Sequence, residues 1–402
     1  MSDRADGPLH DLRVVDLATV VAGPGCARYL ADFGADVIKV ERPGSGDTTR
    51  AMGWTHPDDD VTLWWKLAGR NKRTVVADLK DPDDLDRVRR LIATADVLVE
   101  NFRPKVMERL GFGYEAVRAI NPRMVYCAIS GFGQEGPLSG NPAYDQIVQG
   151  LSGVMSVTGD AQSAPLRVGY PLCDTLGALA AAFAVVSALY RRHQSGRGEY
   201  IDLSMLDATI SAMGWAVSNY LIAGVEAQPI GNQNMTAAPS GAFRCADAQI
   251  NIAANKQEQF ERLCRTIGRP EIATDPRFVE REARKVNRAA LNALIEEGLQ
   301  SRTAAEWEVA LNAEGIPAGQ ILTVPQILAH PQIAARNLVQ ELPMEGSSLA
   351  SIKVVRAGYT LADSQPGARS APPLLGADNA AIFSALGLRP EDLERLGDIG
   401  AI

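Results

Sequence analysis

Short apolar runs and helical stretches alternate through the first 130 residues of the chain. The runs are rich in valine and isoleucine and show no polar alternation, which is typical of strands that are covered on both faces. Helices between such strands predict a parallel sheet, because parallel strands need crossover connections. The expected strands lie at 13–17, 35–41, 73–79, 96–101 and 124–130, and the expected helices at 24–33 and 82–94.

A long apolar helix is predicted over 174–192, where no charged residue follows Asp174 before Arg191. Its apolar centre is short for a membrane span and is interrupted by Gly177 and Ser187, so we interpret it as a buried helix and expect no membrane partner. The N-terminus also lacks the apolar segment of a secretory signal. A further strand is expected at 199–205 and a further helix at 206–224.

The composition changes near residue 226, where a stretch rich in glycine, proline and asparagine indicates a loop over 227–241. After it, a hairpin and three helices are expected at 241–255, 256–267, 286–300 and 303–314. A strand at 351–355 and two short helices near the end follow. The pattern therefore predicts three parts: a large Rossmann-like α/β domain over 1–225, a small α+β domain over 226–335, and a C-terminal segment over 336–402.

The charge balance and the cysteines exclude several classes of protein. A formal net charge of −8 argues against nucleic acid as the main partner, because phosphate binding favours a basic surface. The five cysteines form no C-x-x-C pair, so neither a disulfide framework nor a zinc site is indicated and we expect no bound metal. Unpaired cysteines also indicate a reducing, cytoplasmic location.

The segment 13–41 has the order of a dinucleotide-binding unit: strand, glycine turn, helix and strand. Glu41 stands where such a unit places the acid that binds a ribose. The third position of the glycine fingerprint, however, is Arg28, where close packing of the helix on the strand needs glycine or alanine. The sequence therefore favours a Rossmann-like unit without a nicotinamide site.

Basic residues cluster in the loops around the expected strands. A single lysine or arginine is usually only solvated surface, but the carboxyl ends of parallel strands form the ligand crevice of an open α/β sheet. Several cations at such a crevice predict a polyphosphate site. The residues concerned are Arg42, Arg70, Lys72, Arg73, Lys80, Arg103, Lys105 and Arg109.

Asp174, at the start of the apolar helix, has two interpretations. As an N-cap, its carboxylate accepts hydrogen bonds from free N–H groups of the first turn. The positive end of the helix dipole then lowers its pKa and keeps it ionised, while the apolar helix limits its solvation. A charged, oriented carboxylate of this kind is also an oxygen nucleophile.

Six segments in order resemble family III CoA-transferases, the group that contains formyl-CoA:oxalate and carnitine CoA-transferases. The resemblance covers nearly the whole chain and favours the nucleophile interpretation, because in that family a single aspartate ahead of a long apolar helix attacks the thioester carbonyl. The segments are VVAGPGCARYLADFGADVIKVERPGSGD from Val20, GRNKRTVVADLK from Gly69, DVLVENFRPKVMERLGFGYEAVRAINPRMVYCAISGFGQEGP from Asp96, PAYDQIVQGLSG from Pro142, GRGEYIDLSMLDA from Gly196 and PPLLG from Pro372.

The resemblance implies that Asp174 carries the acyl group as a mixed anhydride and then CoA as an aspartyl thioester. An acceptor carboxylate displaces the CoA without ATP, and no permanently bound cofactor is needed because CoA or acyl-CoA enters as substrate. Succinyl-CoA is the expected donor and a small carboxylic acid the acceptor. The implied CoA site comprises Val21, Ala22, Arg42, Leu79, Lys80, Asn101, Phe102, Arg103, Arg109 and Tyr144.

The resemblance also implies an interlocked homodimer, in which each chain passes through the ring formed by the other and the C-terminal segment returns to the large domain. One position departs from the family: Pro142 stands where some members carry a lysine. The glycine-rich lid of some relatives is not evident. Loop 231–241 is expected to close over the site instead, with Asn232 and Gln233 as acceptor contacts.

Two other functions are compatible with the sequence. The α-methylacyl-CoA racemases share the fold, and they remove and return an α-proton of the substrate with a histidine and an aspartate on its opposite faces. This chain has Tyr144 in the segment where that histidine lies, and tyrosine, with an ordinary pKa of about 10, is a much weaker base. The other function is that of a catalytically silent protein, which would keep the fold and bind CoA but catalyse no reaction. Tyr144 therefore favours transfer over racemisation, and the intact Asp174 and the basic loops favour transfer over a silent protein.

Overall fold

The computed structural model describes residues 7–59, 61–345 and 347–388. Contacts between residues divide the chain into two compact units. The first unit is built from residues before 155, from 167–225 and from residues after 330, and the second from 155–166 and 226–330. The first unit is therefore discontinuous in sequence, since the chain leaves it and later returns.

A six-stranded parallel sheet forms the centre of the first unit, in the order β3-β2-β1-β4-β5-β6. The parallel α/β fold expected from the sequence is thus confirmed. The strand order reverses at β1, and such a switch point is where an open α/β sheet forms its ligand crevice. The strands are β1 (Arg13–Asp16), β2 (Asp36–Glu41), β3 (Lys72–Val76), β4 (Val97–Glu100), β5 (Val125–Ser130) and β6 (Glu199–Ser204).

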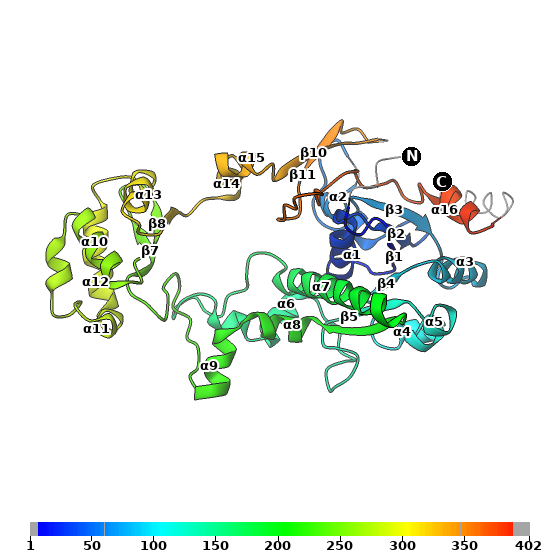
Figure 1. Cartoon of the computed structure of the whole chain (residues 1–402), viewed down its shortest axis with the longest axis horizontal. Helices are drawn as coiled ribbons and strands as arrows, with labels where there is room; N and C mark the ends of the chain where they lie inside the picture. Colours follow the sequence, from blue (N-terminus) through cyan, green and yellow to red (C-terminus); the bar gives the residue numbers. More distant parts are fainter. Residues whose placement is uncertain (1–6, 60, 346, 389–402) are drawn as a thin grey trace. The chain divides into compact units, whose positions relative to one another are not determined.

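Helices cover this sheet and bury two separate apolar cores (Figure 1). Helices α1 and α7 pack on each other over a core that includes Val14 and Cys127. Helices α3, α5 and α16 contribute to the second core, around Ile38 and Leu98. The helical elements of this unit are α1 (Ala22–Asp32), η2 (Thr48–Arg50), α2 (Leu63–Ala68), α3 (Pro82–Ala93), α4 (Val106–Arg109), α5 (Tyr114–Ile120), α6 (Asp145–Leu151), α7 (Leu172–Ser195), α8 (Met205–Ala212), α9 (Trp215–Ala223), α15 (Pro331–Ala335) and α16 (Asn379–Ala385).

Helix α7 differs from the fully buried helix that the sequence predicts. One stripe, which includes Ala181 and Val185, is buried against α1, α8 and the sheet. The opposite stripe is exposed, with Phe183 at 77% and Tyr190 at 69% exposure. Among the described residues, α7 is the one helix long and apolar enough to cross a membrane. Its packing on the sheet accounts for the inner stripe only.

The single helix expected over 206–224 is interrupted. Helix α8 ends at Ala212 and α9 begins at Trp215. Between them, Gly214 has a φ of 54°, a left-handed conformation that glycine adopts at little cost. The chain direction therefore changes at this glycine.

The C-terminal part of the first unit covers the edge strand β3. Asp378 Oδ2 accepts a hydrogen bond from the Thr74 N–H at 2.9 Å, and Asn379 Oδ1 accepts one from the Val76 N–H at 2.8 Å. Free N–H groups on an edge strand invite pairing with other chains, so these side chains protect the sheet. An antiparallel hairpin of β10 (Val339–Pro343) and β11 (Ser351–Val355) precedes this segment. The last helix expected near the C-terminus lies outside the described residues.

The second unit is a small α+β fold. Its antiparallel sheet has the order β7-β8-β9, and β7 and β8 form the predicted hairpin. The core contains Trp307, whose indole N–H donates to the Leu299 carbonyl at 2.7 Å. The elements are β7 (Ser240–Arg244), β8 (Gln249–Ala253), α10 (Gln257–Thr266), η4 (Pro270–Thr274), α11 (Arg281–Val286), α12 (Arg288–Leu299), α13 (Ala304–Ala313), β9 (Ala318–Gln320) and α14 (Val324–Leu328). A turn of 3-10 helix, η3 (Val154–Val157), lies where the chain passes between the two units.

Candidate active site

Asp174 lies in the first turn of α7, where a second carboxylate holds the backbone. Asp145, the first residue of α6, is buried, and its Oδ1 accepts hydrogen bonds from the N–H groups of Cys173 at 2.8 Å and Asp174 at 3.3 Å. Gln149 Nε2 donates to the other oxygen of Asp145 at 2.6 Å. Asp145 therefore caps the start of α7, a role that the sequence predicts for Asp174.

The carboxyl group of Asp174 is left to face the start of another helix. The N–H of Ala22, the first residue of α1, acts on this carboxyl group and favours its charged form. Because α1 packs against α7, two helix N-termini meet at this side chain. A free N–H at the positive end of a helix stabilises negative charge on an oxygen atom.

Burial and the negative charge of Asp145 raise the pKa of Asp174 to about 7, although the Ala22 N–H opposes them. The expected depression of this pKa is therefore wrong. That expectation assumed that Asp174 caps its own helix, whereas Asp145 occupies those donors and adds a like charge. A poorly solvated carboxylate with a raised pKa is a stronger base, and hence a better nucleophile, than an ordinary aspartate.

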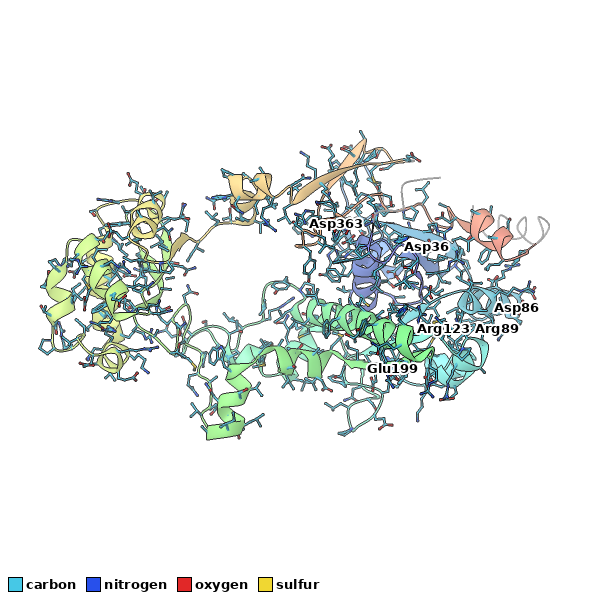
Figure 2. All side chains as sticks on the ribbon, viewed as in Figure 1. Asp36, Asp86, Arg89, Arg123, Glu199 and Asp363 are labelled. Atoms are coloured by element: carbon cyan, nitrogen blue, oxygen red, sulfur yellow. The ribbon has the colours of Figure 1, made fainter. Side chains whose placement is uncertain are left out.

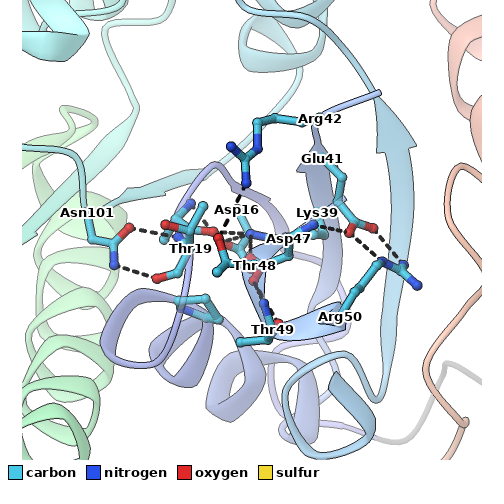
Figure 3. A network of polar contacts seen from close by, with 12 residues as sticks. Asp16, Thr19, Lys39, Glu41, Arg42, Asp47, Thr48, Thr49, Arg50 and Asn101 are labelled. Carbon is cyan, nitrogen blue, oxygen red and sulfur yellow. Dashed lines mark hydrogen bonds and ion pairs between the residues drawn. The ribbon is translucent and has the colours of Figure 1, made fainter. Parts of the chain in front are cut away.

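The loop from β1 to α1, which places Ala22, is tightly held. A Cβ atom at Gly23 would lie 2.2 Å from the Cβ of Ala18. Asn101, after β4, bridges the loop: its Oδ1 accepts from the Thr19 N–H and its Nδ2 donates to the Thr19 carbonyl, both at 2.7 Å (Figure 3). The position of Ala22 thus depends on a glycine and on a side chain from a distant segment.

A buried network of charges lies under the same loop. Lys72 Nζ donates to Asp16 Oδ2 at 2.8 Å and to the carbonyl of Pro24, in the first turn of α1, at 2.9 Å. Lys39 Nζ lies 2.9 Å from Asp47 Oδ2 (Figure 3). Because all four charged groups are buried, each depends on its partners for compensation. The network therefore ties strands β1, β2 and β3 to the start of α1.

Opposite charges control the titration of this network. Burial lowers the pKa of Lys39, but Asp16 and Asp47 outweigh burial and leave the pKa raised. Lys39 and a hydrogen bond from Thr49 lower the pKa of Asp47 to about 2 in spite of its burial. Lys39 and Asp47 are therefore both charged at neutral pH.

A cavity of about 330 Å³, here called the first cavity, opens at the carboxyl ends of β1, β2 and β3. Arg42 and Lys80 are both exposed there, and Arg42 Nη2 donates to Thr48 Oγ1 at 3.4 Å. Two cations at the carboxyl ends of neighbouring parallel strands suit a phosphorylated ligand. The wall includes four of the residues predicted to bind CoA: Arg42, Leu79, Lys80 and Phe102.

The other predicted CoA contacts lie outside the wall of the first cavity. Val21 and Ala22 form the helix start at Asp174, and Asn101 holds Thr19, which lines the cavity. Three further residues have exposed side chains on the segments after β4 and before α6: Arg103, Arg109 and Tyr144.

The two predicted acceptor contacts belong to the second unit. Asn232 is exposed. Gln233 Oε1 accepts from Asn292 Nδ2 at 3.2 Å and from Arg288 Nη1 at 3.5 Å. The described contacts of Gln233 are therefore made within its own unit.

Three of the basic residues expected to hold a polyphosphate are engaged in other contacts. Arg70 is buried and donates to both oxygens of Asp32, at 3.1 and 2.7 Å. Arg73 Nε donates at 2.9 Å to Oδ1 of Asp36, which is labelled in Figure 2. Lys72 belongs to the buried network. All three precede or begin β3, whereas the crevice lies where β3 ends. The expectation is therefore wrong for these three residues.

Glu41 is also engaged structurally. Its carboxylate accepts two hydrogen bonds from Arg50, at 2.7 and 2.8 Å, and one from the Asp47 N–H at 2.8 Å (Figure 3). These contacts occupy the group that a nicotinamide enzyme would use for a ribose. They agree with the argument from Arg28 against a nicotinamide site.

Sequence reasoning does not identify Asp145 or Lys39, and it assigns Lys72 to a polyphosphate site and not to a buried ion network. Asp145 directly follows Tyr144, but no periodicity shows that its carboxylate reaches the start of α7. Lys39 and Lys72 lie in strands, where the apolar pattern predicts a core and not an ion network. A lysine inside an otherwise apolar strand is the one signal that points to such a network.

The sequence of the chain is similar to those of known enzymes. A family model described as CoA-transferase family III matches residues 9–379. The chain belongs to CoA-transferase family III. This transferase is 40% identical over 363 residues to the acetyl-CoA:oxalate CoA-transferase of Acetobacter aceti, covering 90% of this chain and 92% of that protein. It is 36% identical over 397 residues to the succinyl-CoA–D-citramalate CoA-transferase of Chloroflexus aurantiacus, covering 98% of each.

The transferase also resembles a solved structure closely. A CAIB/BAIF family protein from Brucella suis superposes with a TM-score of 0.85 at 34% identity, covering 95% of this chain and 100% of that one. The family match and the named relatives confirm the expected enzyme class, so the protein is a CoA-transferase.

Proposed function

We propose that the transferase moves CoA from a dicarboxylic acyl-CoA, such as succinyl-CoA, to a small carboxylic acid through covalent intermediates on Asp174. The observation that carries this proposal is the environment of Asp174. Its carboxylate is half-buried, faces the Ala22 N–H and has a pKa raised to about 7 by burial and by Asp145. These properties suit an oxygen nucleophile better than a structural cap.

The exchange proceeds by four displacements, none of which needs a proton. The Asp174 carboxylate attacks the thioester carbonyl, expels the CoA thiolate and forms a mixed anhydride. The thiolate attacks the Asp174 carbonyl, releases the donor acid and forms an aspartyl-CoA thioester. The acceptor carboxylate displaces the thiolate to form a second anhydride. The thiolate then attacks the acceptor acyl carbon, which releases the new acyl-CoA and the Asp174 carboxylate.

The residues around Asp174 stabilise the charged states of this sequence. The Ala22 N–H lies where it can donate to the oxygen that gains charge as the tetrahedral intermediate forms. Asp145 keeps the first turn of α7 in place and prevents Asp174 from capping it. Catalysis therefore draws on two helix starts.

CoA binding belongs to the first cavity and its surroundings. Arg42 and Lys80 neutralise the phosphates of CoA, and Leu79 and Phe102 contact its apolar parts. Asn101 acts through Thr19, and exposed Arg103 and Arg109 supply further positive charge. Tyr144 and Val21 lie near the thioester, because they adjoin Asp145 and Ala22.

The substrate class follows from the relatives. Their names specify oxalate with acetyl-CoA, D-citramalate with succinyl-CoA, and glutarate with succinate. All but the acetyl group are dicarboxylic acids or their thioesters. We extend this class to the present chain, with Asn232 and Gln233 of the second unit as acceptor contacts.

A homodimer, interlocked as in the family, is the proposed assembly. The outer stripe of α7 and most apolar side chains of α9, including Ile222 at 85% exposure, are uncovered in the single chain. Exposed apolar surface on this scale marks an interaction site, and a second copy of the chain is the occupant that the family suggests. The five cysteines are all free thiols, which suits the proposed cytoplasmic location.

Mass spectrometry after incubation with succinyl-CoA tests the covalent role of Asp174. We expect a mass increase that maps to Asp174, and hydroxylamine converts the activated carbonyl to a hydroxamate on the same peptide. Asp174→Asn, which keeps the shape of the side chain but removes the nucleophile, serves as the matched control and carries no adduct. Normal turnover by Asp174→Asn, or an adduct on another residue, contradicts the mechanism.

A further inference from the structure

We propose that Arg28 binds the distal carboxylate of a dicarboxylic acyl group in a second cavity beside Asp174. This inference rests on the proposed function and specifies how the transferase would select its substrates. Four observations support it: the position of the cavity, the charge of Arg28, the apolar surroundings and the distance along α1.

The second cavity measures about 280 Å³ and adjoins both the nucleophile and the first cavity. Val21 and Thr175, which line it, directly neighbour Ala22 and Asp174 in sequence. Thr19 and Thr48 line the first cavity, whereas the next residues, Val20 and Thr49, line the second. A ligand with CoA in the first cavity can therefore place its acyl group in the second.

Arg28 carries a positive charge that its partners compensate only in part. Its Nη1 lies 3.3 Å from Asp32 Oδ2, and its side chain is 13% exposed. Arg70 already donates to both oxygens of Asp32, at 3.1 and 2.7 Å, and Asn71 Nδ2 donates to one of them at 2.8 Å. Two guanidinium groups thus share one carboxylate, which leaves a net positive charge at this end of α1.

The rest of the cavity wall strengthens the preference for a carboxylate. Arg28 is the only charged residue among the described residues that line the cavity, and Tyr29, Trp64 and Leu67 are among its neighbours there. In such surroundings a charge is costly unless it is paired, and a guanidinium group matches a carboxylate with two parallel hydrogen bonds. A dicarboxylic acyl group satisfies this need. A monocarboxylic acyl group leaves Arg28 with only its share of Asp32 and with the Tyr29 ring, whose centroid lies 4.2 Å from the Arg28 Cζ.

The geometry of α1 fits a short acyl chain. Val21 and Arg28 lie about two turns apart on the same helix, a rise of about 10 Å. Side chains on a helix can lean back toward its N-terminus, so a rotation of Arg28 away from Asp32 brings the guanidinium group nearer to Ala22. An acyl chain of a few carbons spans the remaining distance between the reacting carbonyl and Arg28.

Substrate pairs that differ only in the distal carboxylate test this proposal. We would measure kcat/KM for succinyl-CoA and butyryl-CoA with the wild-type protein, Arg28→Gln and Arg28→Lys. Asp32 keeps its bonds to Arg70 and Asn71 in both variants. Loss of a charged hydrogen bond predicts a decrease of about 10- to 100-fold for succinyl-CoA in Arg28→Gln, with less than about a 3-fold change for butyryl-CoA. Arg28→Lys keeps the charge, so its kcat/KM for succinyl-CoA is expected to lie between the values of the wild-type protein and Arg28→Gln.

The outcomes separate this inference from the proposed function. Equal losses for both thioesters, no loss for either, or a wild-type preference for butyryl-CoA overturns the role of Arg28. A wild-type protein that transfers CoA from neither thioester contradicts the proposed function instead. In that case the dissociation constants of the two thioesters for unreactive Asp174→Ala, with and without Arg28→Gln, decide the role of Arg28 separately. Equal affinity for both thioesters in the presence of Arg28 overturns it.

Discussion

At the scale of single residues, two aspartates have different roles at the start of α7. Asp145 accepts hydrogen bonds from the N–H groups of Cys173 and Asp174, so the side chain of Asp174, the proposed nucleophile, does not cap the helix. The same contact brings a second negative charge close to Asp174 and raises its pKa. The position and the basicity of Asp174 therefore both depend on one neighbouring carboxylate.

The pH dependence of transfer is expected to follow Asp174. Because its pKa is raised to about 7, the protonated form accumulates below pH 7 and kcat/KM falls toward acid. In Asp145→Asn the like charge is removed, so the pKa of Asp174 falls and the acid limb of the profile moves to lower pH by about one unit. Rates between pH 5 and 9 measure this shift.

Gln149→Leu is the matched control for that variant. It removes the hydrogen bond from Gln149 to Asp145 but keeps the negative charge. Its acid limb is expected to stay near pH 7 even if the maximal rate falls. An unchanged limb in Asp145→Asn would show that Asp145 does not set the pKa of Asp174.

The sequence predicts the nucleophile but not this partner. Asp174 stands out because it is the one charged residue before a long apolar stretch. Asp145 lies among polar and apolar residues without a comparable contrast, and its role arises only when α6 and α7 meet in the fold. The wrong direction for the Asp174 pKa has the same origin, since the helix start alone lowers a pKa that burial and Asp145 raise.

At the scale of elements, the site depends on the close approach of two helices and a loop. Gly23 leaves no room for a Cβ atom beside Ala18, and a Cβ atom at Gly25 would lie 3.0 Å from the Cβ of Ala178 on α7. Small residues thus let α1 reach α7 and present the Ala22 N–H to Asp174. The hydrophobic pattern predicts both helices well, but it does not indicate how closely they pack.

Gly23→Ala is expected to disrupt this arrangement. The added methyl group requires the loop or Ala18 to move, which displaces the Ala22 N–H from Asp174. Overpacking of this kind costs about 1–3 kcal/mol of stability, and loss of an aligned donor lowers kcat by about 10-fold or more. Thermal unfolding and steady-state rates measure both effects. Gly358→Ala, where an added Cβ meets nothing within 4 Å, is the control and leaves both unchanged.

At the scale of the whole molecule, the first unit is completed by residues from both ends of the sequence. Asp378 and Asn379 bind the edge strand β3, and Ile382 and Phe383 enter a core of the parallel sheet. The alternating pattern predicts the sheet, and the change of composition near residue 226 predicts the start of a second domain. The binding of the C-terminal segment to β3 leaves no such pattern. The contact with the β3 backbone is made by two side chains and one backbone hydrogen bond, from the Asp378 N–H to the Thr74 carbonyl, and not by a new strand.

A truncation after Pro366 is expected to expose the edge of β3 and part of the apolar core. Such an edge pairs with other chains, so we expect the shortened protein to aggregate when expressed. The soluble fraction and size-exclusion chromatography measure this outcome. A truncation after Leu388, which keeps α16, is expected to remain soluble and active. A soluble, active protein ending at Pro366 would show that the C-terminal segment does not protect the sheet.

The binding of the C-terminal segment to β3 has a consequence for biosynthesis. Ribosomes add about 5–20 residues per second, so roughly 15–60 s separate the synthesis of β3 from that of the segment that covers it. During this time the nascent chain carries an unprotected sheet edge, while most of the second unit, made from one continuous stretch, emerges and can fold first. The last domain to be finished is thus the one that was started first, and the edge of its sheet stays open to pairing with other chains until the C-terminal segment has been made.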